Sequence, residues 1–252
     1  MRFVYALVLA VVLSGCFHID SLLTVRPDGS ATLRDEVTLS GMALMALMET
    51  EDDEGSPFDE AAMEARAEAL GEGVRVASFE PREDGYTVVF DVDDVRQLRY
   101  ATPEALGENE GEGPDGVDLS FGFDEGDPST LRVLVPKPEP DDDKVEASDA
   151  APEVDPQEQA RMLAMMRSFF ADARMTVAVE VEGAIEETNA SYVDGSRVTL
   201  FDLPFVAVFD VMEANPELMG NEPPEPEAML DELRAIEGVR MEGPGTVRVR
   251  FR

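Results

Sequence analysis

Short segments in which apolar and polar residues alternate one by one recur along the chain, and they restrict its fold more than any other feature. In residues 117–123 the apolar positions are Val117, Leu119, Phe121 and Phe123, and residues 131–135 repeat the pattern after a turn at Gly126-Asp127-Pro128. A period of two places successive side chains on opposite faces of a strand, so each segment is typical of a half-buried strand. The chain is therefore expected to form a sheet built from hairpins.

Three further hairpins are predicted from turn residues. Residues 21–25 and 31–39 flank the turn Arg26-Pro27-Asp28-Gly29-Ser30, and Asp35 interrupts the otherwise apolar row of the second arm. Asp194-Gly195, a dipeptide that favours tight hairpins, joins Tyr192-Val193 to residues 198–201. A last hairpin is expected through Gly243-Pro244-Gly245, with Arg240 in its first arm and residues 247–251 in its second.

Several segments carry helical periodicity and capping residues. Ser56-Pro57-Phe58-Asp59 predicts a helix that ends at Gly71, and Asp155-Pro156-Gln157-Glu158 predicts a helix to about Asp172. Other expected helices are 41–50, 94–100, 203–212 and 229–236. The predicted fold class is α+β, a mainly antiparallel sheet built from hairpins with helices packed on one face.

The acidic composition and the single cysteine exclude some classes of protein. With 20 basic and 55 acidic residues the formal net charge is -35, which repels phosphate backbones, so nucleic acid is not an expected partner. Dense carboxylates also repel one another, and we expect concentrated salt to relieve this cost. Because Cys16 is the one cysteine, no internal disulfide can form.

The N-terminal residues resemble the signal of a bacterial lipoprotein. Arg2 precedes an apolar run from Phe3 to Leu13 that is too short to span a bilayer, and Leu13-Ser14-Gly15-Cys16 looks like a lipobox. The resemblance implies cleavage between Gly15 and Cys16 and a diacylglyceryl group on the Cys16 thiol. Lipid chains such as palmitate would then hold the chain on a membrane. His18 follows so closely that we interpret it as a tether residue.

This resemblance also implies a location. Lipoproteins that lack Asp after the lipidated cysteine generally reach the outer membrane of two-membrane bacteria, and Phe17 fits that sorting. The expected site is the cell envelope, on the outer membrane facing the periplasm, with the acidic domain standing off anionic headgroups on its tether.

From these patterns we predict an order of segments along the chain. It consists of a signal peptide (1–15), a lipidated tether (16–20), a first α+β half (21–135), an acidic disordered loop (136–156), a second α+β half (157–220) and a C-terminal helix plus hairpin (221–252). The loop is assigned because its Pro, Ala and acidic residues offer too little apolar surface to offset the entropy of ordering.

Motifs for catalysis, cofactors or metals are weak in this sequence. It contains neither a Gly-x-Ser-x-Gly nucleophile motif nor a Gly-Lys-Thr/Ser phosphate loop. Asp91 and Asp93 begin like a calcium loop, but Val95 and Arg96 replace the next ligand and the glycine. The chain is therefore predicted not to be an enzyme and to need no cofactor and no metal.

Two features are candidates for binding. Arg248, Arg250 and Arg252 share one face of the last predicted strand, with Arg240 in its partner arm, and they form either a candidate binding patch or pairs with the chain's own carboxylates. Methionines recur in the segments 42–48 and 162–166. Methionine lines adaptable apolar surfaces, so these segments either fill the core or line a groove for lipid.

Two segments of the mature chain resemble LppM-type domains of bacterial envelope lipoproteins. They are Leu23-Thr-Val-Arg-Pro-Asp-Gly-Ser-Ala and Asn189-Ala-Ser-Tyr-Val-Asp-Gly-Ser-Arg-Val-Thr-Leu. The resemblance implies a non-enzymatic α+β envelope domain that touches lipids or glycolipids, and it transfers no functional residue.

The sequence therefore predicts a lipid-anchored envelope lipoprotein with a non-catalytic binding or scaffolding domain, whose partner in the envelope is a protein or a lipid. The alternative hypothesis is a carrier of lipid or another amphiphile, and an envelope hydrolase ranks third.

Overall fold

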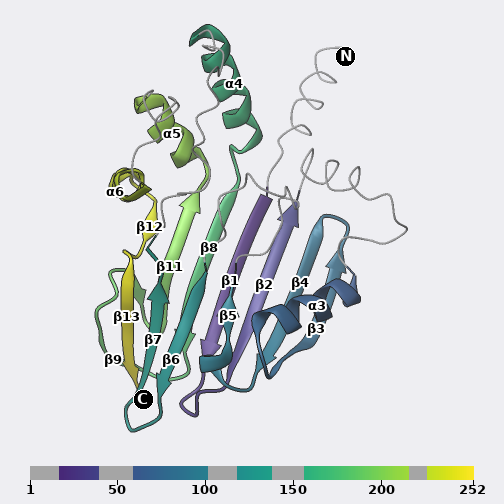
Figure 1. Cartoon of the computed structure of the whole chain (residues 1–252), viewed down its shortest axis with the longest axis vertical. Helices are drawn as coiled ribbons and strands as arrows, with labels where there is room; N and C mark the ends of the chain where they lie inside the picture. Colours follow the sequence, from purple (N-terminus) through teal and green to yellow (C-terminus); the bar gives the residue numbers. More distant parts are fainter. Residues whose placement is uncertain (1–16, 40–58, 102–117, 138–155, 216–225) are drawn as a thin grey trace, which may run out of the picture.

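A computed structural model describes residues 17–39, 59–101, 118–137, 156–215 and 226–252. Two sheets lie face to face, with one helix beside the smaller sheet and three helices at one end (Figure 1). The α+β class with mainly antiparallel pairing is confirmed, but the strands form two sheets where the sequence predicted one. Antiparallel layers of this kind bury one face and leave the other to solvent, as the alternating sequence requires.

The large sheet has β1 (Phe17–Val25) at its centre. β1 pairs with β2 (Ala31–Leu39) in an antiparallel register and with β8 (Arg174–Val181) in a parallel one, which needs a long crossover that no local turn signal reveals. In spatial order the strands are β10 (Val193–Asp194), β11 (Arg197–Pro204), β8 (Arg174–Val181), β1 (Phe17–Val25), β2 (Ala31–Leu39), β4 (Gly85–Val92) and β3 (Val74–Arg82), and β12 (Arg240–Met241) also pairs with β11.

The small sheet combines strands from distant parts of the chain. Its order is β5 (Arg99–Tyr100), β6 (Leu119–Asp124), β7 (Ser129–Val135), β13 (Gly245–Phe251) and β9 (Ile185–Thr188). Both sheets therefore contain strands from each of the predicted halves, 21–135 and 157–220. Strands of the two predicted halves therefore lie next to one another in the large sheet, and β9 and β7 lie on either side of β13 in the small sheet.

The core lies between the two sheets. Inward side chains such as Leu33 and Phe90 of the large sheet and Leu131 and Phe251 of the small sheet are 1% exposed or less. These are the apolar positions of the alternating segments, so that part of the sequence prediction is confirmed. Burial of such rows supplies most of the favourable free energy of folding.

The helix α3 (Glu60–Leu70) covers the part of the large sheet that the small sheet leaves open, near β3 and β4 (Figure 1). Its cap is Asp59, whose carboxylate accepts a hydrogen bond from the Ala62 N–H at 2.8 Å, so the helix begins after the predicted Ser56. It ends at Gly71 as predicted, where φ is 132° and a Cβ would lie 2.3 Å from the Gln97 carbonyl oxygen. Glycine is therefore required at this position.

The helices α4 (Pro156–Phe169), α5 (Val206–Ala214) and α6 (Pro226–Ala235) gather at the end of the molecule where β1 begins (Figure 1). An aromatic cluster joins them to the sheet: the Phe17 ring lies 5.9 Å from that of Phe170 and 4.6 Å from that of Phe205, and Phe170 stacks on Phe209 at 5.8 Å. The helices cap one end of the large sheet and do not lie over its face.

Three local predictions are corrected. The expected helix 94–100 is a single 3-10 turn, η1 (Val95–Gln97), followed by β5. Residues 17–20 of the expected tether instead form the start of β1, which begins at Phe17. The expected C-terminal hairpin is also absent, since β12 and β13 belong to different sheets and Arg240 therefore does not face the arginines of β13.

Other predictions fall on residues that the structure does not describe. They are the signal peptide 1–15, Cys16, the helix 41–50 and most of the acidic loop 136–156.

Candidate functional site

A polar cluster lies in the middle of the otherwise apolar core. Ser21 of β1 and Asp35 of β2 stand opposite each other in the sheet register, and both are fully buried. Arg66 of α3 reaches them from the helix layer, and Tyr86 and Tyr100 come from β4 and β5. We call these five residues the buried polar cluster. Asp35 is the residue that interrupts the apolar row of its strand.

The Asp35–Arg66 ion pair is the centre of this cluster. An Arg66 Nη2 donates to Asp35 Oδ2 at 2.8 Å, and the side chains are 16% and 0% exposed for Arg66 and Asp35. Burial is the largest single influence and alone would lower the pKa of Arg66, but the Asp35 carboxylate, together with Tyr86 and Tyr100, holds that pKa above its ordinary value. Arg66 also donates to the Ala101 carbonyl at 3.2 Å. The pair therefore fixes α3 to the sheet.

Hydrogen bonding in the cluster is incomplete. Within the described part of the chain, Ser21 Oγ, Asp35 Oδ1, Arg66 Nε and the Tyr100 hydroxyl are buried without a protein partner of good geometry. Burial raises the pKa of Tyr86 to about 12 and that of Tyr100 still higher, with a contribution from the Asp35 charge in both. Neutral phenols and a charged pair thus share one apolar interior.

The geometry limits what this cluster can do chemically. Asp35 has no solvent-exposed surface, and Tyr100 is 2% exposed, so a substrate cannot reach either group in this conformation. Buried ion pairs seldom add net stability, but loss of one partner is costly because the other charge stays buried and unpaired. We therefore interpret the buried polar cluster as a set of structural contacts that position α3 on the sheet.

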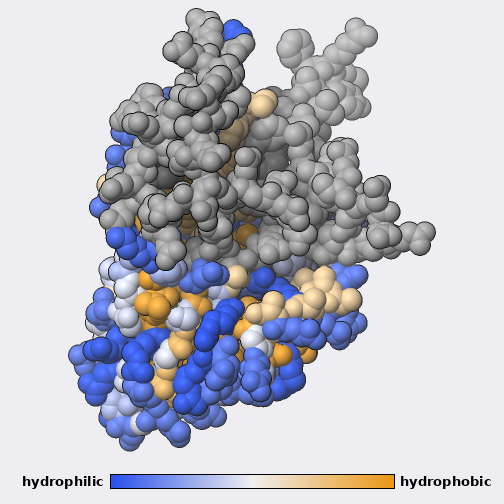
Figure 2. Space-filling view, in the orientation of Figure 1, coloured by the Kyte–Doolittle hydropathy of each residue, from blue (hydrophilic) through white to orange (hydrophobic). Residues whose placement is uncertain are grey.

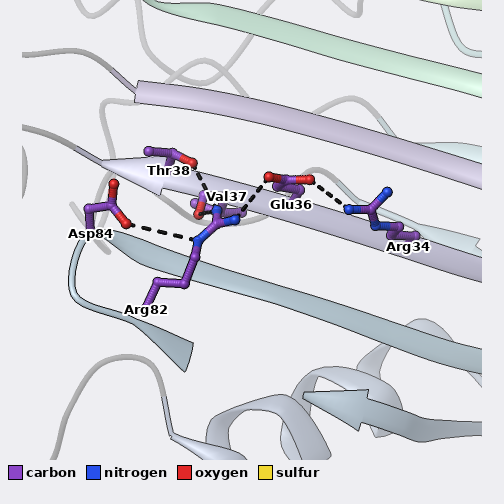
Figure 3. Close-up of polar contacts among 6 residues, drawn as sticks. All are labelled: Arg34, Glu36, Val37, Thr38, Arg82 and Asp84. Carbon is purple, nitrogen blue, oxygen red and sulfur yellow. Dashed lines mark hydrogen bonds and ion pairs between the residues drawn. The ribbon is translucent and has the colours of Figure 1, made fainter. Parts of the chain in front are cut away.

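The opposite face of β2 carries an exposed ion-pair network (Figure 3). Arg82 at the end of β3 donates to Glu36 Oε1 at 2.9 Å and to the Thr38 hydroxyl at 2.9 Å, and Arg34 donates to Glu36 Oε2 at 2.8 Å. The hydrogen bond from Arg82 is the main reason that the pKa of Glu36 lies below its ordinary value. These contacts join the edge strand to β2 across β4.

The predicted arginine patch is divided between two sheets. Arg250 pairs with Glu187 at 2.7 Å, and Arg252 pairs with Asp127 at 2.6 Å and with Glu186 at 3.1 Å. Arg248 is exposed and stands opposite Arg132 of β7, whereas Arg240 lies in the large sheet opposite Asp202. Within the described residues neither Arg240 nor Arg248 has a carboxylate at ion-pair distance. The structure thus brings together three of the four arginines.

A buried carboxylate missed by the sequence reasoning holds the segment 189–192. Glu242, 5% exposed, accepts hydrogen bonds from the Ser191 N–H at 2.5 Å and the Tyr192 N–H at 3.2 Å. Asn189 donates to the Thr246 carbonyl at 2.9 Å and accepts from the Arg248 N–H at 2.6 Å. The sequence indicated a hairpin arm at Tyr192 and a resemblance over this segment, but not that its polar residues join β12 and β13 to the turn before β10.

The residues around the predicted anchor lie in regular structure. Phe17 is 1% exposed and points into the aromatic cluster, while His18 is exposed on β1 and is not a tether residue. Met165 of α4 is 57% exposed, so it does not line an enclosed groove, and the methionines of 42–48 lie outside the described residues. Among the helices that the structure describes, none has the length and apolar character to cross a bilayer.

No group of three or more metal-ligating side chains occurs among the described residues.

An open groove lies at the end of the molecule opposite the helices α4, α5 and α6. It is lined by Pro27, Asp28, Glu125 and Gly126, which belong to the β1–β2 and β6–β7 turns. In the coloured part of Figure 2 hydrophilic residues surround several apolar patches.

Comparisons with known proteins find one weakly similar structure. No protein-family model matches the chain, and no curated protein matches it. One similar solved structure is the NMR structure of the folded domain of LppM from Mycobacterium tuberculosis, with 13% sequence identity and a TM-score of 0.33, covering 95% of this chain and 92% of that chain. A similarity of this degree neither establishes a family nor assigns a function.

Proposed function

We propose that the chain is a lipid-anchored envelope lipoprotein whose folded part binds or scaffolds other envelope components. The observation that carries this proposal is the position of β1. The predicted cleavage and lipidation site, Gly15-Cys16, is followed at once by Phe17, the first residue of the central strand of the large sheet. Cleavage there would leave every described strand and helix in the mature protein.

A binding or scaffolding role is favoured over catalysis by the use of the buried carboxylates. Asp35 pairs with Arg66, Asp202 accepts two hydrogen bonds from Arg174 at 2.6 and 2.8 Å, and Glu242 accepts from backbone N–H groups. Groups held in this way connect elements of the fold, and a general acid or base must instead be free to reach a substrate. We place the protein on the outer membrane facing the periplasm, following the sorting expected for Phe17.

Metabolic labelling with palmitate tests the anchor. We expect cells to incorporate the label into the wild-type protein and to retain it in the membrane fraction, and the C16S variant to lose both label and membrane retention. Because Cys16 is the only cysteine, no other thiol can carry the lipid. An unlabelled wild-type product, or a C16S variant that still sediments with membranes, would overturn the proposal.

The absence of catalysis has its own test. Purified mature protein is expected to leave ester, glycoside and peptide substrates unchanged, whereas turnover that copurifies with the folded protein would contradict a purely binding or scaffolding role.

A further inference from the structure

The proposed anchor residue, Cys16, directly precedes the first residue of β1 in the sequence, which restricts how a lipid-anchored domain can sit on a membrane. Cα atoms of neighbouring residues are about 3.8 Å apart, so the lipid-bearing residue would lie directly beside Phe17. Phe17 is fixed, since it pairs with Leu39 of β2 and its ring packs against Phe170 and Phe205. The bilayer must therefore be within reach of this end of the sheet.

The register shows which elements share that end. β8 runs parallel to β1 and begins with Arg174 opposite His18, and β11 ends with Pro204 opposite Arg174. α4 leads into β8 and α5 follows β11, so both helices stand at the start of β1 (Figure 1). The turns around Pro27 and Gly126 lie at the other end.

An exposed apolar side chain lies on the same side. Among the residues that the structure describes, Met165 of α4 is the most exposed large hydrophobic residue, at 57%, followed by Leu134 at 48% and Val193 at 42%. Met165 precedes Phe170 by five residues, which places it about 7 Å along the helix axis from the aromatic cluster around Phe17. Half-buried apolar residues packed against the core also gather here: Phe170, Met175, Leu203, Phe205, Val208, Leu230 and Ile236.

Two arginines at this end form ion pairs with nearby carboxylates. Arg167 of α4 pairs with Asp210 at 2.6 Å and with Glu213 at 2.9 Å, and Arg174 pairs with Asp202. Local pairing allows approach to a lipid surface although the whole chain is strongly negative, provided that the headgroups are zwitterionic. Arg161 on α4 is exposed and can approach headgroup phosphates.

We propose that the end formed by α4, α5 and the start of β1 is a membrane-contacting surface, with Met165 at the level of the lipid headgroups and upper acyl chains. This inference rests on the proposed lipid anchor. An amphipathic helix held at an interface buries its apolar side chains at that depth. The long axis of the strands then points away from the bilayer and presents the turns at Pro27 and Gly126 to the periplasm.

Tryptophan fluorescence tests this orientation, because the chain contains no Trp. The probe is M165W, and the matched control is V193W on β10, a similarly exposed residue. Val193 pairs with Val198, which stands opposite Val179 and, through β8, near the Leu23 end of β1. At about 3.3 Å per residue, β1 separates the two ends by some 25 Å. Each lipidated full-length variant is reconstituted into vesicles of brominated phosphatidylcholine.

We expect bromine to quench the M165W indole several-fold more than the V193W indole. Equal and weak quenching of both indoles, in protein that carries lipid by mass and floats with the vesicles, would overturn the orientation and leave the anchor intact. A protein without lipid that does not float would instead overturn the proposed function, and the orientation with it. Should M165W fail to fold, R161W, one helical turn away on the same face, replaces it.

Discussion

Asp35 and Glu36 are neighbours on β2, and their side chains point to opposite faces of the large sheet. Each carboxylate pairs with an arginine from another element: Asp35 with Arg66 of α3 at 2.8 Å, and Glu36 with Arg82 of β3 at 2.9 Å. Their surroundings differ, because the Asp35 side chain is fully buried and that of Glu36 is 35% exposed. The same kind of carboxylate–arginine ion pair therefore occurs in an apolar interior and at an aqueous surface, one residue apart.

The difference shows why an ion pair cannot be valued from its distance alone. In the interior, removal of water makes both charges costly, and the partner is needed to hold them. At the surface water solvates each charge, so the pair adds little. Substitutions in the two pairs should therefore separate the two environments, with the larger effects in the core.

Removal of one partner of the buried pair should have the largest effect. R66M leaves the Asp35 carboxylate unpaired in the core, and we expect the free energy of unfolding to fall by about 3–5 kcal/mol. Urea denaturation of wild type and variant measures it. A loss below about 1 kcal/mol would mean that the buried and exposed pairs are energetically alike.

The tyrosines of the buried cluster should make stability fall at high pH. Burial raises the pKa of Tyr86 from 10.0 to about 12, so the neutral phenol stabilises the folded state in full below pH 10, and this contribution is lost as the pH rises toward 12. A pKa raised by two units corresponds to a loss of about 3 kcal/mol of unfolding free energy once the phenol ionises. Unfolding free energies measured from pH 8 to 12 should fall less steeply for Y86F. Identical slopes would show that Tyr86 titrates as a solvated phenol.

Replacement of both members of the buried pair should reverse the loss. The double variant D35L/R66M removes the two charges together, and apolar substitutes for buried pairs are neutral or stabilising by about 1–4 kcal/mol. We expect its unfolding free energy to equal or exceed that of wild type, measured beside R66M in one denaturation series. A double variant as unstable as R66M would show that the pair itself, and not the isolated charge, maintains the fold.

The exposed network should give the smallest effect. Because hydrogen bonding to Arg82 lowers the pKa of Glu36 below its ordinary 4.5, the pair stabilises the fold above pH 4.5, and the contribution is lost as the pH falls through the lower folded-state value. For E36Q we expect a loss below about 1 kcal/mol at pH 7 that shrinks with added salt. A loss as large as that of R66M would contradict the contrast between the two faces.

The sequence predicted the strands well because alternation and turn residues are local signals. The hairpin around Arg26-Pro27-Asp28-Gly29-Ser30 and the tight turn at Asp194-Gly195 formed as expected. Pairing between distant strands had no such signal. The parallel contact of β1 with β8 and the position of β13 between β7 and β9 join residues that are far apart in the sequence, and no local pattern specifies such contacts.

The candidate sites were predicted less well, and for related reasons. Asp35 was visible as a break in an apolar row, but its partner Arg66 lies 31 residues away on a helix whose position depends on the tertiary fold. Glu242 had no signal at all among 55 acidic residues. The arginines of β13 were placed correctly on one strand, and Arg240 was misplaced because Gly243-Pro244-Gly245 was interpreted as a hairpin and is instead a connection between sheets.

The most direct test of the whole account is the intact mass of the protein purified from membranes. We predict a chain that begins at Cys16 and carries the added mass of two or three fatty chains at its N-terminus. A membrane-derived product that retains Met1, or one that begins elsewhere and bears no lipid, would contradict the claim that the central strand is attached directly to a bilayer.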